Sequence, residues 1–217
     1  MDKKLSIDEL LNILDEYNHS ELHVHHTSAP SHKDFNGDNY FILQENMRKF
    51  HIRERNWKDI GQHLTLFPDG LFVTGRPFEQ IPASIKGYNG TVNKVPLAVE
   101  MLGNFNVACD AFEGKQKNSI LALAKYFYNK GKYIRFHREN ASTDCPGETI
   151  NKDKFMSEVK DFGKAIFSDV NGHWAEQYII DVVEKGIMVG YSDNTFRPDK
   201  AISRAELAML ISTGKLK

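Results

Sequence analysis

The chain has 217 residues, a formal net charge of −1 and a hydrophobic share of 41%. This length suits one domain of ordinary size plus a small module, and the hydrophobic share is typical of a packed core rather than of disorder. The nearly neutral charge argues against a protein that coats nucleic acid. No apolar run reaches the length of a membrane span, so we also expect no membrane insertion.

The first segment predicts a helix rather than a signal peptide. Ser6 and Glu9 form a capping-box pattern, and leucines then recur at helical spacing through residues 6–17. Lysines are present, but the apolar centre of a secretory signal is missing. We therefore expect a protein that is made in the host cytoplasm without a signal peptide.

Residues 22–32 read LHVHHTSAPSH and hold four of the nine histidines; a fifth, His19, lies just upstream. The alternation predicts a strand that runs into a loop. On a strand, His23 and His25 share one face and His26 lies on the other.

The centre of the chain predicts further helices and strands. In order we expect a helix over 43–55 with Met47 and Phe50 on one face, a hairpin around Pro68-Asp69-Gly70, a buried strand within 95–105, an apolar helix ending at Gly131, and a strand over 133–140 that enters a loop. Helices and strands thus mix across residues 1–162, which predicts an α/β domain with a mixed central β-sheet flanked by helices. Residues 167–212 carry turn signals and two short helical patterns, and we assign residues 163–217 to a separate, small α-helical module.

The chain has only two cysteines, Cys109 and Cys145, so a disulfide framework is not expected. Catalytic zinc sites use three protein ligands, commonly imidazole and thiolate. His137 and Cys145 can converge across the predicted loop, and the histidine-rich segment can supply the third ligand. Periodicity leaves His23, His25 and His26 all possible.

Glu100 stands among apolar neighbours in a strand that otherwise looks buried. Burial raises the pKa of a carboxyl group toward neutrality, which is the range a proton shuttle needs. The alternative is a structural carboxylate paired with an arginine such as Arg76 or Arg138.

Four blocks then occur in order: VHHTSA, WKDIGQHLTLFPDGLFVTGRP, LAVEMLGNF and FHRENASTDCPG. Over roughly residues 20–150 the chain resembles the zinc N-acetylmuramoyl-L-alanine amidases, a family that includes phage lysozyme-like amidases and animal peptidoglycan recognition proteins. The resemblance implies Zn²⁺ held by His25, His137 and Cys145. It further implies hydrolysis of the amide between N-acetylmuramic acid and L-alanine of peptidoglycan, with Glu100 as general base.

Two positions depart from the family pattern. Gln62 stands where some members have a tyrosine, and it cannot act as an acid at neutral pH. Thr143 stands where others have a lysine, and we expect its hydroxyl to bind a developing oxyanion. With His25 as the ligand, we expect His23 and His26 to be packing or supporting groups.

We expect the two outer histidines of the histidine-rich region, His19 and His32, to be solvated.

Residues 167–211 resemble a surface-layer homology (SLH) motif through FSDV, HWA, GIMVGYSDNTFRP and ISRAE. The resemblance implies binding of secondary cell-wall polysaccharide. Arg204 suits an anionic sugar through its bidentate geometry. Tyr191 and Trp174 offer aromatic faces to sugar rings, although we favour a core position for Trp174. Glu206 shares this segment with Arg204 and also completes a capping box with Ser203.

One motif of this size can hardly cover the apolar faces of its own helices. These faces could be buried against the larger domain of the same chain, or closed cyclic symmetry could bury them among copies of the chain. We therefore expect a homotrimer through residues 167–212, with the avidity that several polymer sites provide.

Together the two parts predict a phage endolysin: a zinc-dependent peptidoglycan amidase that acts at the Gram-positive cell wall, to which the SLH motif directs it. The alternatives are a host or prophage autolysin of the same chemistry and a non-catalytic peptidoglycan recognition protein. A purely structural surface-layer protein is disfavoured because only one wall motif is found.

Overall fold

The structure is a computed structural model that describes residues 2–162, 167–185, 187–191, 193 and 195–212. The chain divides into two compact units, Met1–Phe162 (the N-terminal unit) and Gly163–Lys217 (the C-terminal unit). In the part of the chain that is described, no helix is both long enough and apolar enough to cross a membrane.

The N-terminal unit alternates strands and helices along the chain. Its elements are β1 (Lys4–Leu5), α1 (Ile7–Leu14), β2 (Glu21–His26), η1 (His32–Asp34), α2 (Tyr40–Glu54), β3 (Leu64–Leu66), β4 (Phe72–Thr74), β5 (Leu97–Met101), α3 (Gly114–Asn129), β6 (Tyr133–Phe136), η2 (His137–Glu139) and α4 (Lys152–Asp161). Local signals set several of these bounds. Ser6 and Glu9 form the predicted capping box of α1, and Gly131 follows α3 at φ +66°, a conformation that glycine adopts without strain.

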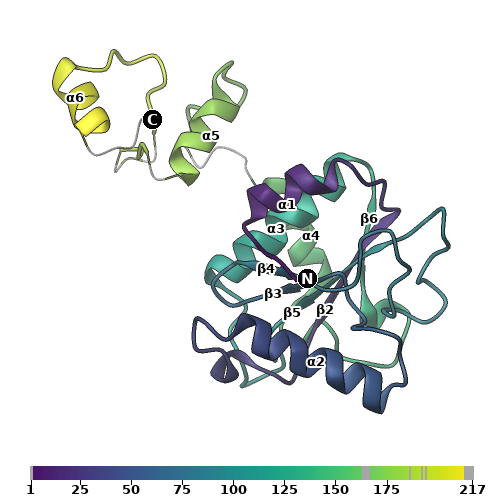
Figure 1. Ribbon diagram of the computed structural model, residues 1–217. Helices are drawn as coiled ribbons and strands as arrows, with labels where there is room; N and C mark the ends of the chain where they lie inside the picture. The colour runs from purple at the N-terminus through teal and green to yellow at the C-terminus, as the bar shows by residue number, and fades with distance from the viewer. Residues whose placement is uncertain (1, 163–166, 186, 192, 194, 213–217) are drawn as a thin grey trace. The chain divides into compact units, whose positions relative to one another are not determined.

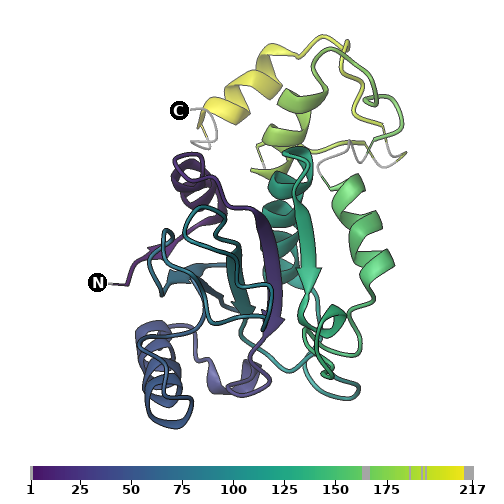
Figure 2. The ribbon, with the colours of Figure 1, turned by 90° about the vertical axis from the view of Figure 1, so that its right-hand side faces the viewer.

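One six-stranded sheet organises this unit, in the order β1-β4-β3-β5-β2-β6. The pairs β3–β5, β5–β2 and β2–β6 are parallel, whereas β4 pairs antiparallel with both β1 and β3. The predicted mixed sheet and the β3–β4 hairpin are therefore confirmed. Helices α1, α3 and α4 cover one face of the sheet, and α2 lies on the other (Figure 1). Figure 2 shows α2 and α3 on opposite sides of the strands.

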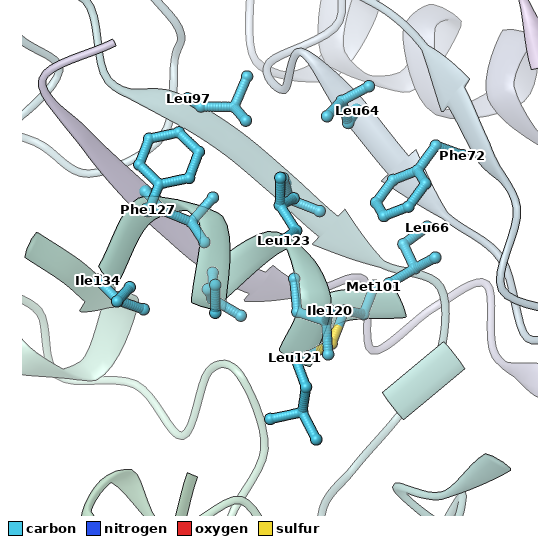
Figure 3. Packing of buried hydrophobic residues seen from close by; sticks show 14 of the residues in the cluster. Leu64, Leu66, Phe72, Leu97, Met101, Ile120, Leu121, Leu123, Phe127 and Ile134 are labelled. Atoms are coloured by element: carbon cyan, nitrogen blue, oxygen red, sulfur yellow. The ribbon is translucent and has the colours of Figure 1, made fainter. Parts of the chain in front are cut away.

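Strand periodicity separates the main core from the face that carries the polar side chains. The main core lies between the sheet and helices α1, α3 and α4. Figure 3 shows Ile120, Leu123 and Phe127 of α3 beside side chains of the sheet such as Leu66 and Leu97. Side chains alternate along a strand, so in β2 and in β5 the residues next to each core residue face α2. Those residues are His23, His25, Ala98 and Glu100.

Helix α2 contains the predicted residues 43–55 except Arg55. The prediction that Met47 and Phe50 share one apolar face is correct only for Met47. Met47 is buried, whereas Phe50 is 50% exposed. Both side chains line a cleft on this face of the sheet. Phe50 is exposed because the helix borders an open cleft at this position instead of a closed core.

The C-terminal unit contains the two predicted helices, α5 (Glu176–Glu184) and α6 (Arg204–Ser212). Among the described residues of this unit, the buried ones are aliphatic and include Val170, Ile179 and Leu210. The expected core position of Trp174 is wrong, because its side chain is 82% exposed. Aliphatic side chains occupy the buried positions described in this unit, and the indole of Trp174 lies outside them.

Candidate metal centre

Three residues that are far apart in the sequence meet at one edge of the sheet. His25 lies near the end of β2, His137 follows the last residue of β6, and Cys145 lies in the loop beyond. Strands β2 and β6 are parallel neighbours, so their carboxyl ends lie side by side, where open α/β sheets bind ligands. The candidate ligand atoms of these three residues all lie within 4.8 Å of one another. No other such group of His, Cys, Asp or Glu occurs in the part of the chain that the structure describes.

The orientation of the three side chains also suits a metal ion. The Sγ atom of Cys145 lies 3.5 Å from Nδ1 of His25, and the rings of His25 and His137 are 4.7 Å apart at their centroids. Burial lowers the pKa of His25 well below its usual value and lowers the pKa of His137, so both imidazoles are neutral and keep a lone pair. Two neutral imidazoles and one thiol match the donor set of a catalytic zinc site with an open fourth position.

Cys145 is a buried thiol with one stabilising backbone contact. Burial raises the pKa of Cys145 to about 12, while the backbone N–H of His26 lies 3.4 Å from Sγ and donates to it. Without a cation the sulfur therefore keeps its proton at neutral pH. A bound divalent ion would displace that proton, and the negative charge of the resulting thiolate would offset part of the positive charge of the ion.

Glu100 lies beside this cluster. The strand register places it next to His25 on β2 and next to Thr65 on β3. Burial raises the pKa of Glu100 to about 7. Burial is the only cause of this shift, and the carboxylate has no hydrogen bond or ion pair with any residue that the structure describes, so it is available to a ligand in the cleft.

The predicted alternative, a pairing of Glu100 with Arg76 or Arg138, is wrong. Both guanidinium groups are used by backbone carbonyls instead. Arg76 donates to the carbonyls of Ile60 and Ile81, at 2.9 and 2.7 Å. Arg138 donates to the carbonyls of Gly147 and Ile150, at 2.5 and 3.1 Å. These bonds hold the loops around the site and leave the carboxylate without a counter-charge.

A cleft of about 910 Å³ opens over the cluster and extends toward α2. Thr143 and Gln62 line it together with the three candidate ligands and Glu100. The Thr143 hydroxyl accepts a hydrogen bond of 3.2 Å from the backbone N–H of Cys145, so its own proton is free to point elsewhere. Gln62 is buried and its Nε2 donates to Thr65 at 2.9 Å; its Oε1 has no partner among the described residues.

Among the other histidines of this region, His26 has the predicted supporting role, whereas the predicted solvation of His19 and His32 is wrong. His26 accepts a hydrogen bond from the backbone N–H of Phe105 through Nδ1, as expected of a supporting group. His19, expected to be solvated, is only 6% exposed and its Nδ1 lies 3.2 Å from the carbonyl of Val95. His32 is half-buried and bound to Gln116 at 2.9 Å. Loop 77–96 and α3 cover these two rings, which the local sequence does not indicate.

Ser84 is a residue at the site that the sequence analysis did not identify. Its Oγ lies 2.6 Å from Nε2 of His25 and 3.0 Å from Nδ1 of His23. Ser84 belongs to an irregular loop, and the side chain of Asn89 fixes this loop by accepting from the backbone N–H groups of Ser84 and Ile85. A serine in an aperiodic loop carries no sequence signal for such a position.

In the C-terminal unit, the predicted capping box of α6 is confirmed by the bonds between Ser203 and Glu206, at 2.8 and 3.1 Å. Tyr191 is contacted by two cations, the guanidinium of Arg197 at 4.1 Å from the ring centroid and Lys200, which donates to its hydroxyl at 2.8 Å. Arg204 is exposed. Among the described residues, the polar partners of the Tyr191 ring and hydroxyl are Arg197 and Lys200, not Arg204.

Comparison with known proteins finds similarities for both units. Residues 166–208 match the family described as S-layer homology domain. The chain is 49% identical over 49 residues to a cellulosome-anchoring protein of Acetivibrio thermocellus. The aligned segment covers 23% of this chain and 11% of that protein. The chain is 25% identical over 112 residues to peptidoglycan recognition protein 1 of Bos indicus, covering 50% of this chain and 57% of the relative.

A solved structure of an endolysin N-acetylmuramoyl-L-alanine amidase from Clostridium intestinale superposes with a TM-score of 0.50 at 24% identity, over 66% of this chain and 85% of that one. The chain spans little more than half of the length of peptidoglycan recognition protein 1 and a small part of the anchoring protein. Residues 166–208 are therefore an S-layer homology domain, and the N-terminal unit has the fold of N-acetylmuramoyl-L-alanine amidases and peptidoglycan recognition proteins.

Proposed function

We propose that the N-terminal unit is a zinc-dependent N-acetylmuramoyl-L-alanine amidase. The observation that carries this proposal is the convergence of His25, His137 and Cys145 beside an unpaired Glu100 in an open cleft. A zinc ion held by the two imidazoles and the thiolate would polarise the scissile carbonyl and lower the pKa of a bound water. The substrate is the amide that joins the lactyl group of N-acetylmuramic acid to L-alanine.

Side chains of the protein supply proton transfer and binding of the developing oxyanion. Glu100 accepts a proton from the attacking water and delivers it to the leaving amine nitrogen, because a carboxyl group with a pKa near 7 exchanges protons readily in both directions. The Thr143 hydroxyl donates to the oxygen on which negative charge develops, since its acceptor side is already occupied by the Cys145 N–H. Gln62 supplies a polar wall and no proton.

The test is mass spectrometry of purified peptidoglycan after incubation with the protein. The proposal requires new free L-alanine amino termini, with the glycan strands left intact. Fragments cut in the sugar backbone or elsewhere in the stem peptide would contradict it.

A non-catalytic recognition function is the second candidate, and the identity to peptidoglycan recognition protein 1 favours it. It predicts that peptidoglycan fragments bind in the cleft but are released unchanged. Calorimetry with a muramyl peptide, run beside the digestion assay, separates the two candidates. Binding without product supports recognition, and product supports the amidase.

We also propose that the S-layer homology domain directs the enzyme to secondary cell-wall polysaccharide of a Gram-positive wall, with Arg204, Glu206, Tyr191 and Trp174 at the polymer. The domain indicates association with a cell wall. Together the two units suit a phage endolysin, or an autolysin of the same chemistry. Loss of turbidity of whole cells after addition from outside, compared with expression inside a phage-free host, distinguishes these settings.

The trimer remains a proposal that rests on exposed apolar side chains of α6. Leu207 is 41% exposed and Ile211 is 58% exposed. We propose that both pack against other copies of the chain in a homotrimer through residues 167–212. Light scattering on the full chain should give three times the monomer mass, and Leu207→Ser with Ile211→Ser should return the monomer. A monomer at micromolar concentration in the unmodified protein contradicts the idea.

A further inference from the structure

A continuous line of hydrogen-bonding side chains runs from Arg135 to His25 on the α2 face of the sheet. Arg135 donates to both oxygens of Glu21, at 2.8 and 2.9 Å. Oε1 of Glu21 lies 2.6 Å from Nε2 of His23. Nδ1 of His23 lies 3.0 Å from Oγ of Ser84, and the same Oγ lies 2.6 Å from Nε2 of His25. His23 has no exposed surface, and neither the arginine nor the glutamate belongs to the candidate metal cluster.

The direction of every bond in this line follows from the Glu21 end. The carboxylate of Glu21 is held by a bidentate arginine, so it is ionised and can only accept. His23 must therefore donate through Nε2. Because Arg135 already balances the charge of Glu21, the fully buried imidazole of His23 remains neutral and its Nδ1 is an acceptor.

Only one set of hydrogen-bond directions then remains for the hydroxyl of Ser84. It donates its single proton to Nδ1 of His23, so its oxygen accepts from Nε2 of His25. A neutral His25 that carries its proton on Nε2 has a free lone pair on Nδ1. That atom is the one that faces Cys145, at 3.5 Å.

We propose that Glu21, His23 and Ser84 are positioning residues that set the tautomer of His25, so that Nδ1 offers its lone pair to the metal. The proposal rests on the proposed zinc site. With the opposite direction of bonding, a proton on Nδ1 of His25 would block that lone pair. The line also fixes the ring plane, because Ser84 is anchored by Asn89 and Arg135 donates to Asn140 at 2.8 Å. Outer partners of this kind commonly change metal affinity by about 10- to 100-fold when removed.

The first experiment measures zinc affinity of the full chain by competition with a chromophoric chelator. Ser84→Ala should weaken binding about 10- to 100-fold, and Ser84→Thr, which keeps the hydroxyl, should restore it to within about threefold. The matched control is Ser20→Ala, because the Ser20 hydroxyl bonds the same loop at the carbonyl of Lys94, outside the line. It should leave the affinity unchanged. Equal affinity for Ser84→Ala and the unmodified protein overturns the proposal.

The second experiment reads the tautomers directly in the metal-free protein, from two-bond ¹H–¹⁵N correlations of the histidine rings. Both His23 and His25 should carry their proton on Nε2. In Glu21→Gln the side-chain amide can donate to His23, so His23 should move its proton to Nδ1. Placement of the His25 proton on Nδ1 in the unmodified protein overturns the proposal. A chain that binds no zinc at all refutes the proposed amidase, and the tautomer measurement still decides the role of the line.

Discussion

The two faces of strands β2 and β5 show how one pair of segments serves two purposes. On the face toward α3, Leu22, Val24, Leu97 and Val99 are completely buried in an apolar cluster. On the face toward α2, His23, His25 and Glu100 lie one residue out of phase with them, and His25 and Glu100 line a cleft. The core face holds the strands in register, and that register places Glu100 beside His25. We therefore expect that residues next to each other in the sequence alter the stability and the chemistry of this domain separately.

The largest effect is expected on the site, from Cys145→Ser. Zinc content should fall to near zero, and the amidase rate should drop about 10³-fold or more, because a catalytic metal contributes several kcal/mol of transition-state stabilisation. The measurements are metal analysis and product release from peptidoglycan. Cys109→Ser is the matched control, since Cys109 is exposed and outside the cluster. Full zinc occupancy in Cys145→Ser would exclude this ligand set.

Glu100→Gln should leave zinc content and folding unchanged and lower kcat by about 10²-fold or more, which is the usual contribution of general acid–base catalysis. Glutamine keeps the shape of the side chain but cannot shuttle a proton. Glu158→Gln, a change in α4 away from the cleft, serves as the control. A rate within a factor of two of the unmodified protein would assign the base to another group.

On the core face, Leu97→Ala should reduce the free energy of unfolding by about 2–5 kcal/mol, because a fully buried leucine leaves a cavity. Zinc affinity and kcat per folded molecule should stay the same. Urea unfolding and active-site titration provide the two measurements. A loss of kcat equal to that of Glu100→Gln would show that the two faces are not separable.

His63 is a buried histidine outside the candidate ligand set, and its burial makes the stability of the domain depend on pH. His63 donates to the carbonyl of Gln80 through Nε2 and accepts from the Ala98 N–H through Nδ1, and burial lowers its pKa to about 3. Unfolding returns that pKa to about 6.5, so the unfolded chain binds more protons below this value. The stability contributed by the neutral ring is therefore complete above pH 6.5 and is lost as the pH falls toward 3.

By pH 4 this loss should reach about 3 kcal/mol for His63 alone. Unfolding midpoints of the unmodified protein and of His63→Gln, measured at pH 7 and pH 4, isolate the contribution. The difference in free energy between the two pH values should be smaller in the variant. Equal pH dependence in both proteins would contradict a neutral, hydrogen-bonded His63.

The smallest effect is expected in the C-terminal unit. Trp174→Ala should change the free energy of unfolding by less than about 0.5 kcal/mol, because the indole is 82% exposed. Binding to isolated wall polysaccharide should weaken if the indole contacts sugar rings, and a pull-down on purified walls measures this. A large loss of stability would show that Trp174 packs in the interior of the unit, which contradicts the structure.

Much of the fold follows from short-range patterns in the sequence. The alternation of residues 22–26 places His23 and His25 on one face, and the turn at Pro68-Asp69-Gly70 forms the hairpin between β3 and β4. The Ser6–Glu9 and Ser203–Glu206 boxes mark the starts of α1 and α6. These features depend on backbone geometry within a few residues, so local composition determines them.

The partners of these residues depend on contacts between distant parts of the chain. Ser84 reaches His23 and His25 across some 60 positions of the chain, His19 is covered by a loop, and both arginines proposed for Glu100 bind carbonyl groups instead. Trp174 lies outside its unit although its sequence pattern is equally compatible with the interior. Such contacts depend on how loops close over the sheet. Local patterns in the sequence thus set the elements and the residue types at the site, whereas long-range packing of the chain selects which side chains meet and which remain exposed.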